Sequence, residues 1–209
     1  MDWMLDLDGV VADWTGGVLR LMAPDLDPAP IHHQLTHWNA LPEALQPCFP
    51  GKTVAEVDQL MWDMIEEAGD EFWTELDVLD EGLALVEYAL EHAKLTGGEF
   101  AFVTTAANHP SSAAGKVRWL KNVFGNRTVP STGKKITRSY VFTPLKHLCS
   151  GRNRILVDDG THNVRDWAAA GGIGFLWRQP WNAGTPHPRG RLSELDAVVR
   201  AHTIREGTF

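Results

Sequence analysis

Short runs of consecutive apolar residues alternate with segments of helical spacing along most of the chain. Helical spacing is found from about Ser111 to Phe124 and again before Gly171 and Gly172. Strands that are apolar throughout and separated by helices are typical of parallel sheets with right-handed crossovers. The pattern therefore predicts an α/β fold with a doubly wound parallel sheet, whose strands are expected at residues 3–7, 100–103, 140–142, 154–157 and 173–177.

The interval between the first two predicted strands is much longer than a simple crossover between parallel strands requires. It contains three prolines between residues 24 and 30, which interrupt any helix, and it then turns to clear helical spacing. We interpret this interval as an inserted helical cap of residues 16–97. The predicted core domain then consists of residues 1–15 and 98–209.

Two long helices are predicted within this cap. Thr53 and Glu56 have the spacing of a capping box, in which each side chain accepts a hydrogen bond from a free backbone N–H. Apolar residues recur with helical spacing from Val54 to Ala68, and residues 81–94 repeat the pattern. Residues 72–76, Phe-Trp-Thr-Glu-Leu, are expected to form a short aromatic connector between the two helices.

The composition is that of a soluble globular protein, with 44% hydrophobic and 22% charged residues among 209. The net charge of −8 argues against nucleic acid as a partner, because duplex-binding modules carry a broad basic surface. Two cysteines, Cys48 and Cys149, cannot form a disulfide framework and suit a reducing compartment. No apolar run reaches the roughly 18 residues of a membrane span, and the start of the chain has no signal-peptide pattern. We expect a soluble, cytoplasmic protein with no membrane partner.

Acidic and hydroxyl side chains stand at the ends of three of the predicted strands. Because ligands bind at the carboxyl ends of strands in a doubly wound sheet, we expect these side chains to share one edge. Clustered carboxylates repel one another, and a bound hard cation removes that cost. An all-oxygen set of ligands suits Mg²⁺ rather than zinc, so Mg²⁺ is the predicted cofactor. The residues concerned are Asp6, Asp8, Thr104, Thr105, Asp158 and Asp159.

The order of these residues resembles the motifs of the haloacid dehalogenase superfamily of phosphotransferases over most of the chain. Residues 6–10, Asp-Leu-Asp-Gly-Val, resemble its first motif. In that superfamily the first aspartate is the nucleophile and the second is a general acid and base, which implies these roles for Asp6 and Asp8. The resemblance also implies a Rossmann-like core, and it assigns to Thr104 and Lys146 the task of holding the phosphoryl oxygens.

The same resemblance implies how Mg²⁺ is held. Asp158 and Asp159 match the acidic fourth motif of the superfamily. Asp159 is expected to bind the metal directly, together with Asp6 and the backbone carbonyl of Asp8. Asn163, on the following helix, is expected to support Asp159.

Within the superfamily, the chain more closely resembles the 5′(3′)-deoxyribonucleotidases and their phage and bacterial relatives. Residues 8–17, Asp-Gly-Val-Val-Ala-Asp-Trp-Thr-Gly-Gly, resemble their opening, and residues 72–76 resemble the aromatic segment that ends their cap. Aromatic residues at these places stack on the nucleobase in that family, which implies this role for Trp14 and for Phe72 or Trp73. The other expected substrate-binding residues are Gly9, Thr105, Ala106 and Asn163.

The function implied is a Mg²⁺-dependent 5′-nucleotidase that hydrolyses (deoxy)ribonucleoside monophosphates through an aspartyl-phosphate, and the resemblance also suggests a homodimer. The same chemistry suits a phosphatase of another small phosphate, such as a sugar phosphate. The basic segment 133–138 suits a 3′-phosphatase or repair partner that acts on nucleic-acid ends. Lys134 and Lys135, in this segment, are alternatives to Lys146 for the third motif.

Three other tryptophans and a pair of histidines are interpreted as structural. Trp62, Trp119 and Trp167 lie on apolar helix faces and are predicted to pack in the core. His33 and His37 have the spacing of a metal-binding pair on a helix, but no third ligand stands at a familiar distance. We therefore expect solvated or capping histidines there rather than a zinc site.

Overall fold

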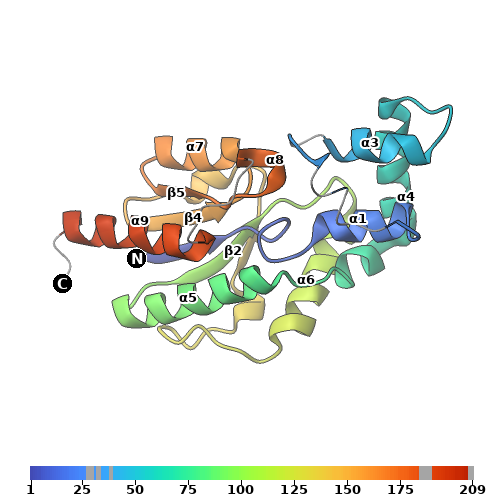
Figure 1. Ribbon diagram of the computed structural model, residues 1–209. Helices are drawn as coiled ribbons and strands as arrows, with labels where there is room; N and C mark the ends of the chain where they lie inside the picture. The colour runs from blue at the N-terminus through green and yellow to red at the C-terminus, as the bar shows by residue number, and fades with distance from the viewer. Residues whose placement is uncertain (27–30, 32–33, 38–39, 184–189, 207–209) are drawn as a thin grey trace.

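The computed structural model describes residues 1–26, 31, 34–37, 40–183 and 190–206. It contains a sheet of five strands in the order β3-β2-β1-β4-β5, in which every neighbouring pair is parallel (Figure 1). This topology confirms the predicted α/β fold with a doubly wound parallel sheet. The strands are β1 (Asp2–Leu5), β2 (Phe100–Thr104), β3 (Tyr140–Phe142), β4 (Arg154–Asp158) and β5 (Ile173–Leu176).

Helices cover both faces of the sheet, because the strands carry apolar side chains on both sides. On one face Leu5 and Phe102 pack into a large core with three helices. On the other face Met4, Val103 and Trp167 belong to a smaller core. The first face is covered by α5 (Asp80–Thr96), α6 (Pro110–Phe124) and α9 (Arg191–Glu206), and the second by α7 (Thr161–Ala169).

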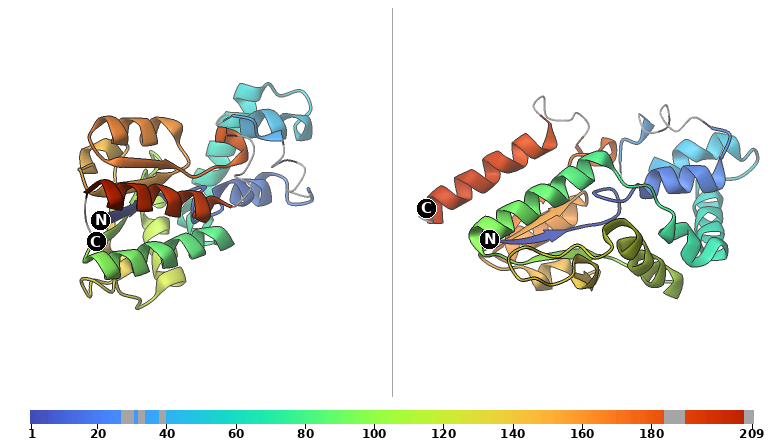
Figure 2. Two further views of the ribbon diagram at one scale, coloured as in Figure 1. Left: turned by 60° about the vertical axis from the view of Figure 1, so that its left-hand side comes forward. Right: turned by 90° about the horizontal axis from the view of Figure 1, so that it is seen from below.

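Two of these helices, α5 and α9, are far apart in the sequence but pack against each other in the fold. α5 and α9 run side by side in both views of Figure 2, and the Tyr88 hydroxyl on α5 lies 3.0 Å from Asp196 Oδ1 on α9. The remaining short elements of this region are η2 (Ile136–Arg138), η3 (Lys146–Cys149) and α8 (Pro180–Ala183). The contact between α5 and α9 closes the core on the side of the sheet that carries Leu5.

The first strand is shorter than predicted, and the expected end at Leu7 is wrong. The carbonyl of Leu7 accepts hydrogen bonds from the backbone N–H groups of Val10, Val11 and Ala12. The chain therefore leaves the sheet after Leu5 and forms a tight loop, because these N–H groups are satisfied within the loop rather than by a strand. This loop carries the candidate residues at positions 6, 8 and 9.

A group of helices lies beyond the carboxyl ends of the strands, at the right of Figure 1. It consists of α1 (Trp14–Met22), α3 (Ala40–Leu45) and α4 (Val54–Thr74), with the short helix η1 (Gln46–Cys48) after α3. The predicted capping box at the start of α4 is confirmed. Thr53 N donates to Glu56 Oε2 (2.7 Å), and Glu56 N donates to Thr53 Oγ1 (3.3 Å).

The predicted aromatic connector is wrong in its first part, since Phe72, Trp73 and Thr74 are the last residues of α4. The helix changes direction at Gly69, whose φ of +66° favours glycine, and then continues. Phe72 and Trp73 are thereby kept on the buried side of α4. Propensity alone did not indicate that the helix resumes after this kink.

The boundaries of the predicted cap, residues 16–97, stay a prediction. α5 falls within that range, yet it packs beside β1 and β2 of the sheet. Among the described residues, no helix combines the length and the apolar character needed to cross a membrane.

Candidate functional site

Asp6 is the first residue after β1, and a buried lysine links it to the end of β4. Lys146 Nζ lies 2.9 Å from Asp6 Oδ2 and 2.7 Å from Asp158 Oδ2. The Lys146 residue is only 2% exposed. Burial by itself would lower the pKa of Lys146, but the negative charges of Asp6 and Asp158 outweigh burial and raise that pKa. Lys146 therefore remains a cation between two carboxylates.

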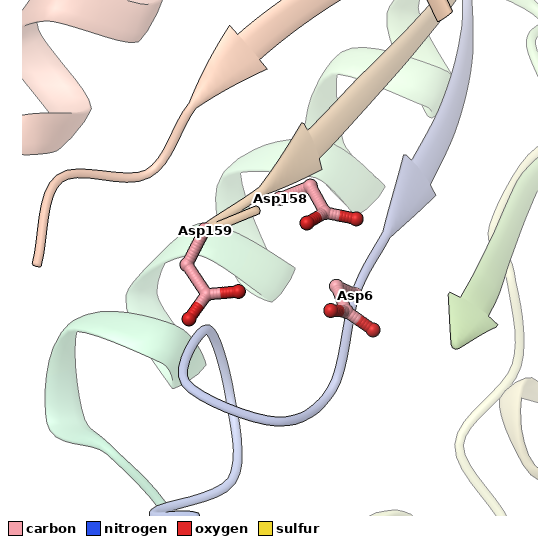
Figure 3. Close-up of side chains that lie close together, drawn as sticks. All are labelled: Asp6, Asp158 and Asp159. Atoms are coloured by element: carbon pink, nitrogen blue, oxygen red, sulfur yellow. The ribbon is translucent and has the colours of Figure 1, made fainter. Parts of the chain in front are cut away.

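A third carboxylate, that of Asp159, completes a compact acidic cluster. Oxygen atoms of Asp6, Asp158 and Asp159 all lie within 4.8 Å of one another, and Figure 3 shows the three side chains gathered at the ends of β1 and β4. Burial raises the pKa of Asp158, and the charge of Asp6 adds to this effect. Burial and the charges of Asp6 and Asp158 raise the pKa of Asp159 well above its ordinary value. A cation among these carboxylates would remove much of the cost of ionising them.

Side chains from the segment after β5 fix the position of Asp159. Trp181 Nε1 donates to Asp159 Oδ2 (2.9 Å), and Asn182 Nδ2 donates to the Asp159 carbonyl (2.7 Å). Gly9 approaches closely from the loop after β1, where a Cβ would lie 2.3 Å from Asp159 Oδ2 and where φ is +71°. Among the described residues, the buried Asp159 Oδ1 has no hydrogen-bond partner. Oδ1 is therefore the oxygen that a bound cation would satisfy.

The acidic cluster fits Mg²⁺, since carboxylate oxygens are the ligands that this ion prefers and Asp159 Oδ1 lacks another partner. Asp158 is less available, because its Oδ1 accepts from Gly160 N (2.7 Å) and from Asn163 Nδ2 (3.1 Å), while Oδ2 contacts Lys146. The prediction that Asn163 supports Asp159 is therefore wrong. The Gly160 N–H holds the Asp158 carboxylate over the start of α7, where Asn163 can reach it.

Asp8 is held by a lysine that the sequence analysis missed. Lys116 Nζ, on α6, donates to Asp8 Oδ2 (2.5 Å), to the Thr105 carbonyl (2.7 Å) and to Thr104 Oγ1 (3.2 Å). Burial raises the pKa of Asp8 and the charge of Asp6 adds to this, although the charge of Lys116 acts in the opposite direction. Asp8, Thr104 and Thr105, which the sequence predicted to share one edge of the sheet, thus meet around the ammonium group of Lys116.

A cavity of about 360 Å³ opens beside these groups, large enough for a small organic ligand. Asp8, Asp159 and Thr105 provide polar lining, and much of the remainder is apolar. Four tryptophans belong to this lining, and the ring centroids of two of them, Trp14 and Trp62, are 6.0 Å apart. The apolar lining residues include Trp14, Trp62, Trp73, Trp181, Leu35, Leu41, Pro42 and Met61.

The structure corrects two predictions about aromatic residues. Trp62 is not a core residue, because it is 40% exposed and lines the cavity, whereas Trp119 and Trp167 are buried as predicted. Phe72 does not belong to the cavity lining, since its ring packs near Gly17 of α1. Trp73 does line the cavity and meets Phe72 edge to face.

Only two of the other predicted substrate-binding residues line the cavity. Gly9 and Thr105 line the cavity, while Ala106 and Asn163 do not belong to its described lining. His37 lines it too and lies 3.2 Å from Glu43, and its predicted companion, residue 33, lies outside the described residues. Trp62 and Trp181 also line the cavity, although the resemblance implied no role for either of them.

The two alternative lysines for the third motif lie elsewhere. Lys134 contacts Glu99, and Lys135 donates to Asn126, both on the exposed surface. Lys116 could have been suspected from the sequence, because it shares the buried side of α6 with Ser112 and Leu120 at a spacing of four residues. A lysine on such a face needs a buried partner. For Trp181 we find no comparable signal in the sequence.

No protein-family model matches this sequence, and no curated protein matches it. Among solved structures, a hydrolase from Streptococcus pneumoniae TIGR4 is similar over 95% of this chain and 97% of its own, with a TM-score of 0.53 and 13% identity. A haloacid dehalogenase-like hydrolase from Streptococcus pneumoniae is similar over 82% of this chain and 81% of its own chain, with a TM-score of 0.45 and 12% identity. The first of these likenesses shows that the chain shares its overall fold with a hydrolase.

Proposed function

We propose that the protein is a Mg²⁺-dependent phosphomonoesterase of the haloacid dehalogenase superfamily, and that its substrate is a nucleoside 5′-monophosphate. One observation carries the proposal. The buried carboxylates of Asp6, Asp158 and Asp159 converge with Lys146 at the carboxyl edge of a parallel sheet, and the adjoining cavity is lined by tryptophans. The order Asp6, Asp8, Thr104, Lys146 and Asp159 along the chain also agrees with the motifs of that superfamily.

In the proposed reaction, an oxygen of Asp6 attacks phosphorus and forms an aspartyl-phosphate while the bond to the ester oxygen breaks. Asp6, Asp159 and the carbonyl of Asp8 would hold Mg²⁺, which when bound would offset the negative charge of the phosphate. Lys146, next to Asp6 Oδ2, adds a second positive charge. Thr104 keeps its hydroxyl proton for a phosphoryl oxygen, because Thr104 Oγ1 accepts a hydrogen bond from Lys116.

Asp8 is proposed to carry the protons of both steps. It gives a proton to the leaving ester oxygen, and it then takes one from the water that attacks the aspartyl-phosphate and releases inorganic phosphate. The raised pKa of Asp8 favours the protonated form that the first step needs. Its place at the cavity wall is where a leaving group would lie.

The character of the cavity supports a nucleoside as the leaving group. Aromatic rings such as those of Trp14 and Trp62 offer flat apolar faces for a nucleobase. A sugar phosphate would instead need more polar groups in the lining. The nucleic-acid alternative has less support, since neither Lys134 nor Lys135 lines the cavity and the chain is acidic overall.

The test is phosphate release from a panel of nucleoside monophosphates, sugar phosphates and a 3′-phosphorylated oligonucleotide, with Mg²⁺ or with EDTA. We expect nucleoside monophosphates to react fastest, and we expect EDTA and Asp6→Asn to abolish release. Asp25→Asn, at an exposed position, is the matched control and should react like the wild type. A wild type that is inactive on the whole panel with Mg²⁺ would refute the proposal.

A second measurement tests the nucleoside. Trp14→Ala should raise KM for nucleoside monophosphates by about tenfold, because a stacked base contributes roughly 1–3 kcal/mol. The turnover number should change little, since no hydrogen bond or ion pair of the described residues joins the Trp14 side chain to the acidic cluster. An unchanged KM would favour a sugar phosphate or another small phosphate instead.

A further inference from the structure

Lys116 is a second buried lysine next to the acidic cluster, and the proposed reaction does not use it directly. The residue is 2% exposed and lies on α6, which is remote in sequence from the loop that carries Asp8. Its three contacts, with Asp8 Oδ2, the Thr105 carbonyl and Thr104 Oγ1, account for the three N–H donors of an ammonium group. Lys116 therefore has no donor left for a substrate.

The two carboxylate oxygens of Asp8 differ in their hydrogen bonding. Oδ2 lies 2.5 Å from Lys116 Nζ, whereas the buried Oδ1 has no hydrogen-bond partner among the described residues. Bonds to Thr104 and Thr105 at the end of β2 hold the Lys116 ammonium group in place, and the Asp8 carboxylate cannot turn without breaking its own contact with that group. The Asp8 side chain as a whole is 27% exposed and belongs to the lining of the cavity, so a ligand there can reach the carboxyl group that Lys116 holds.

The side chain of Lys116 is itself held by the cap helix α4. Its Nζ lies 5.1 Å from the centroid of the Trp73 ring, a cation–π contact. The preceding residue, Gly115, permits this approach, because a Cβ there would lie 2.5 Å from Trp73 Cβ and 2.6 Å from the Asp70 carbonyl. α6 and α4 therefore pack closely enough to fix the ammonium group and to keep water from it.

We propose that Lys116 is a positioning residue, which orients the Asp8 carboxyl group so that it passes the proton to the leaving group. This inference rests on the proposed phosphomonoesterase function. In the step concerned, an Asp6 oxygen forms a bond to phosphorus and the bond between phosphorus and the ester oxygen breaks. The ester oxygen takes the proton from the Asp8 carboxyl group. Lys116 touches neither the phosphate nor the leaving group, and acts only through Asp8.

The test compares two substrates that differ in their need for that proton. A nucleoside 5′-monophosphate releases an alkoxide and needs protonation, whereas 4-nitrophenyl phosphate releases a stable phenolate. The quantity measured is kcat/KM, which reports the first phosphoryl transfer and not the later hydrolysis. In Lys116→Met we expect a loss of about 100-fold with the nucleotide, the lower range for general acid catalysis, and at most a few-fold with the nitrophenyl ester.

Control variants separate positioning from folding. Asp8→Asn should show the same selective loss, while Lys121→Met, an exposed lysine on the same helix, should react like the wild type. Thermal unfolding is measured for each variant, and Lys116→Gln, which keeps a hydrogen-bond donor but no charge, is the second variant if Lys116→Met does not fold. A selective loss in Lys116→Gln supports the proposal in the same way.

The outcomes are distinct. Equal losses with both substrates would mean that Lys116 only supports the structure, and no loss would mean that Asp8 is oriented without it, so either result overturns the inference. In both cases an active wild type leaves the proposed function standing. A wild type that hydrolyses neither substrate with Mg²⁺ overturns the proposed function and this inference together.

Discussion

Replacing Lys146 by methionine removes the cation from the acidic cluster and keeps a side chain of similar length. The ammonium group lies 2.9 Å from Asp6 Oδ2 and 2.7 Å from Asp158 Oδ2, and the side chain is 2% exposed. Removing one partner of a buried ion pair costs about 3–5 kcal/mol, because the remaining charge stays buried. We expect the metal-free variant to lose about this much free energy of unfolding near neutral pH.

The free energy of unfolding that Lys146→Met removes should increase as the pH rises. Burial and the charge of Asp6 raise the pKa values of Asp158 and Asp159 in the folded protein. A carboxyl with a raised folded pKa contributes stability below its unfolded pKa, and that contribution is lost as the pH rises through the folded pKa. Without Lys146 the pKa of Asp158 rises further, so the cost of Lys146→Met grows with pH. The slope is at most about 1.4 kcal/mol per pH unit for each carboxyl.

The assay is urea unfolding in EDTA at about pH 5.5 and about pH 7.5, a range in which lysine itself stays charged. We expect the smaller difference between variant and wild type at the lower pH. Lys134→Met is the matched control, because Lys134 makes an exposed contact with Glu99 and its loss should cost less than about 1 kcal/mol. A cost of Lys146→Met that is below about 1 kcal/mol, or that is larger at the lower pH, would refute this account of the cluster.

Three further predictions concern the metal and the packing around the site. Mg²⁺ at about 100 times its Kd should raise the free energy of unfolding by about 2.7 kcal/mol and Tm by about 5–10 °C, and EDTA should reverse both. Trp181→Phe removes the donor to Asp159 Oδ2 and should weaken Mg²⁺ binding about 10- to 100-fold by calorimetry, whereas Trp62→Phe should not. Gly115→Ala forces a Cβ against Trp73 and should cost about 1–3 kcal/mol in urea unfolding, and a cost near zero would show that α4 and α6 can separate freely.

Much of the sheet could be predicted because its signals are local. Buried parallel strands need consecutive apolar residues, and such runs surround Leu5, Phe102 and Val157. Asp6 follows β1 directly and Asp158 is the last residue of β4, so the end of each strand also places the carboxylate. Asp6 and Asp158 could therefore be assigned to one edge of the sheet before the structure was known.

The predictions that are wrong concern residues whose surroundings are set by parts of the chain that are distant in sequence. Trp62 follows Met61 on α4, and helical spacing could not show that α4 leaves this position facing a cavity rather than the core. The prediction for Asn163 names Asp159 instead of Asp158, because the two aspartates are adjacent in sequence and only the turn into α7 brings Asn163 to Asp158. Phe72 and Trp73 were assigned to a connector, because nothing local shows that α4 resumes after its kink.

Local sequence patterns specify the succession of strands and helices along the chain, the capping box of α4 and the positions of the carboxylates. Each of these depends on residues that are neighbours in the chain or within one helical turn. The contact between Lys116 and Asp8, by contrast, arises only when the chain folds. Lys116 lies 108 residues from Asp8, and a lysine is buried only where folding brings it a partner of opposite charge.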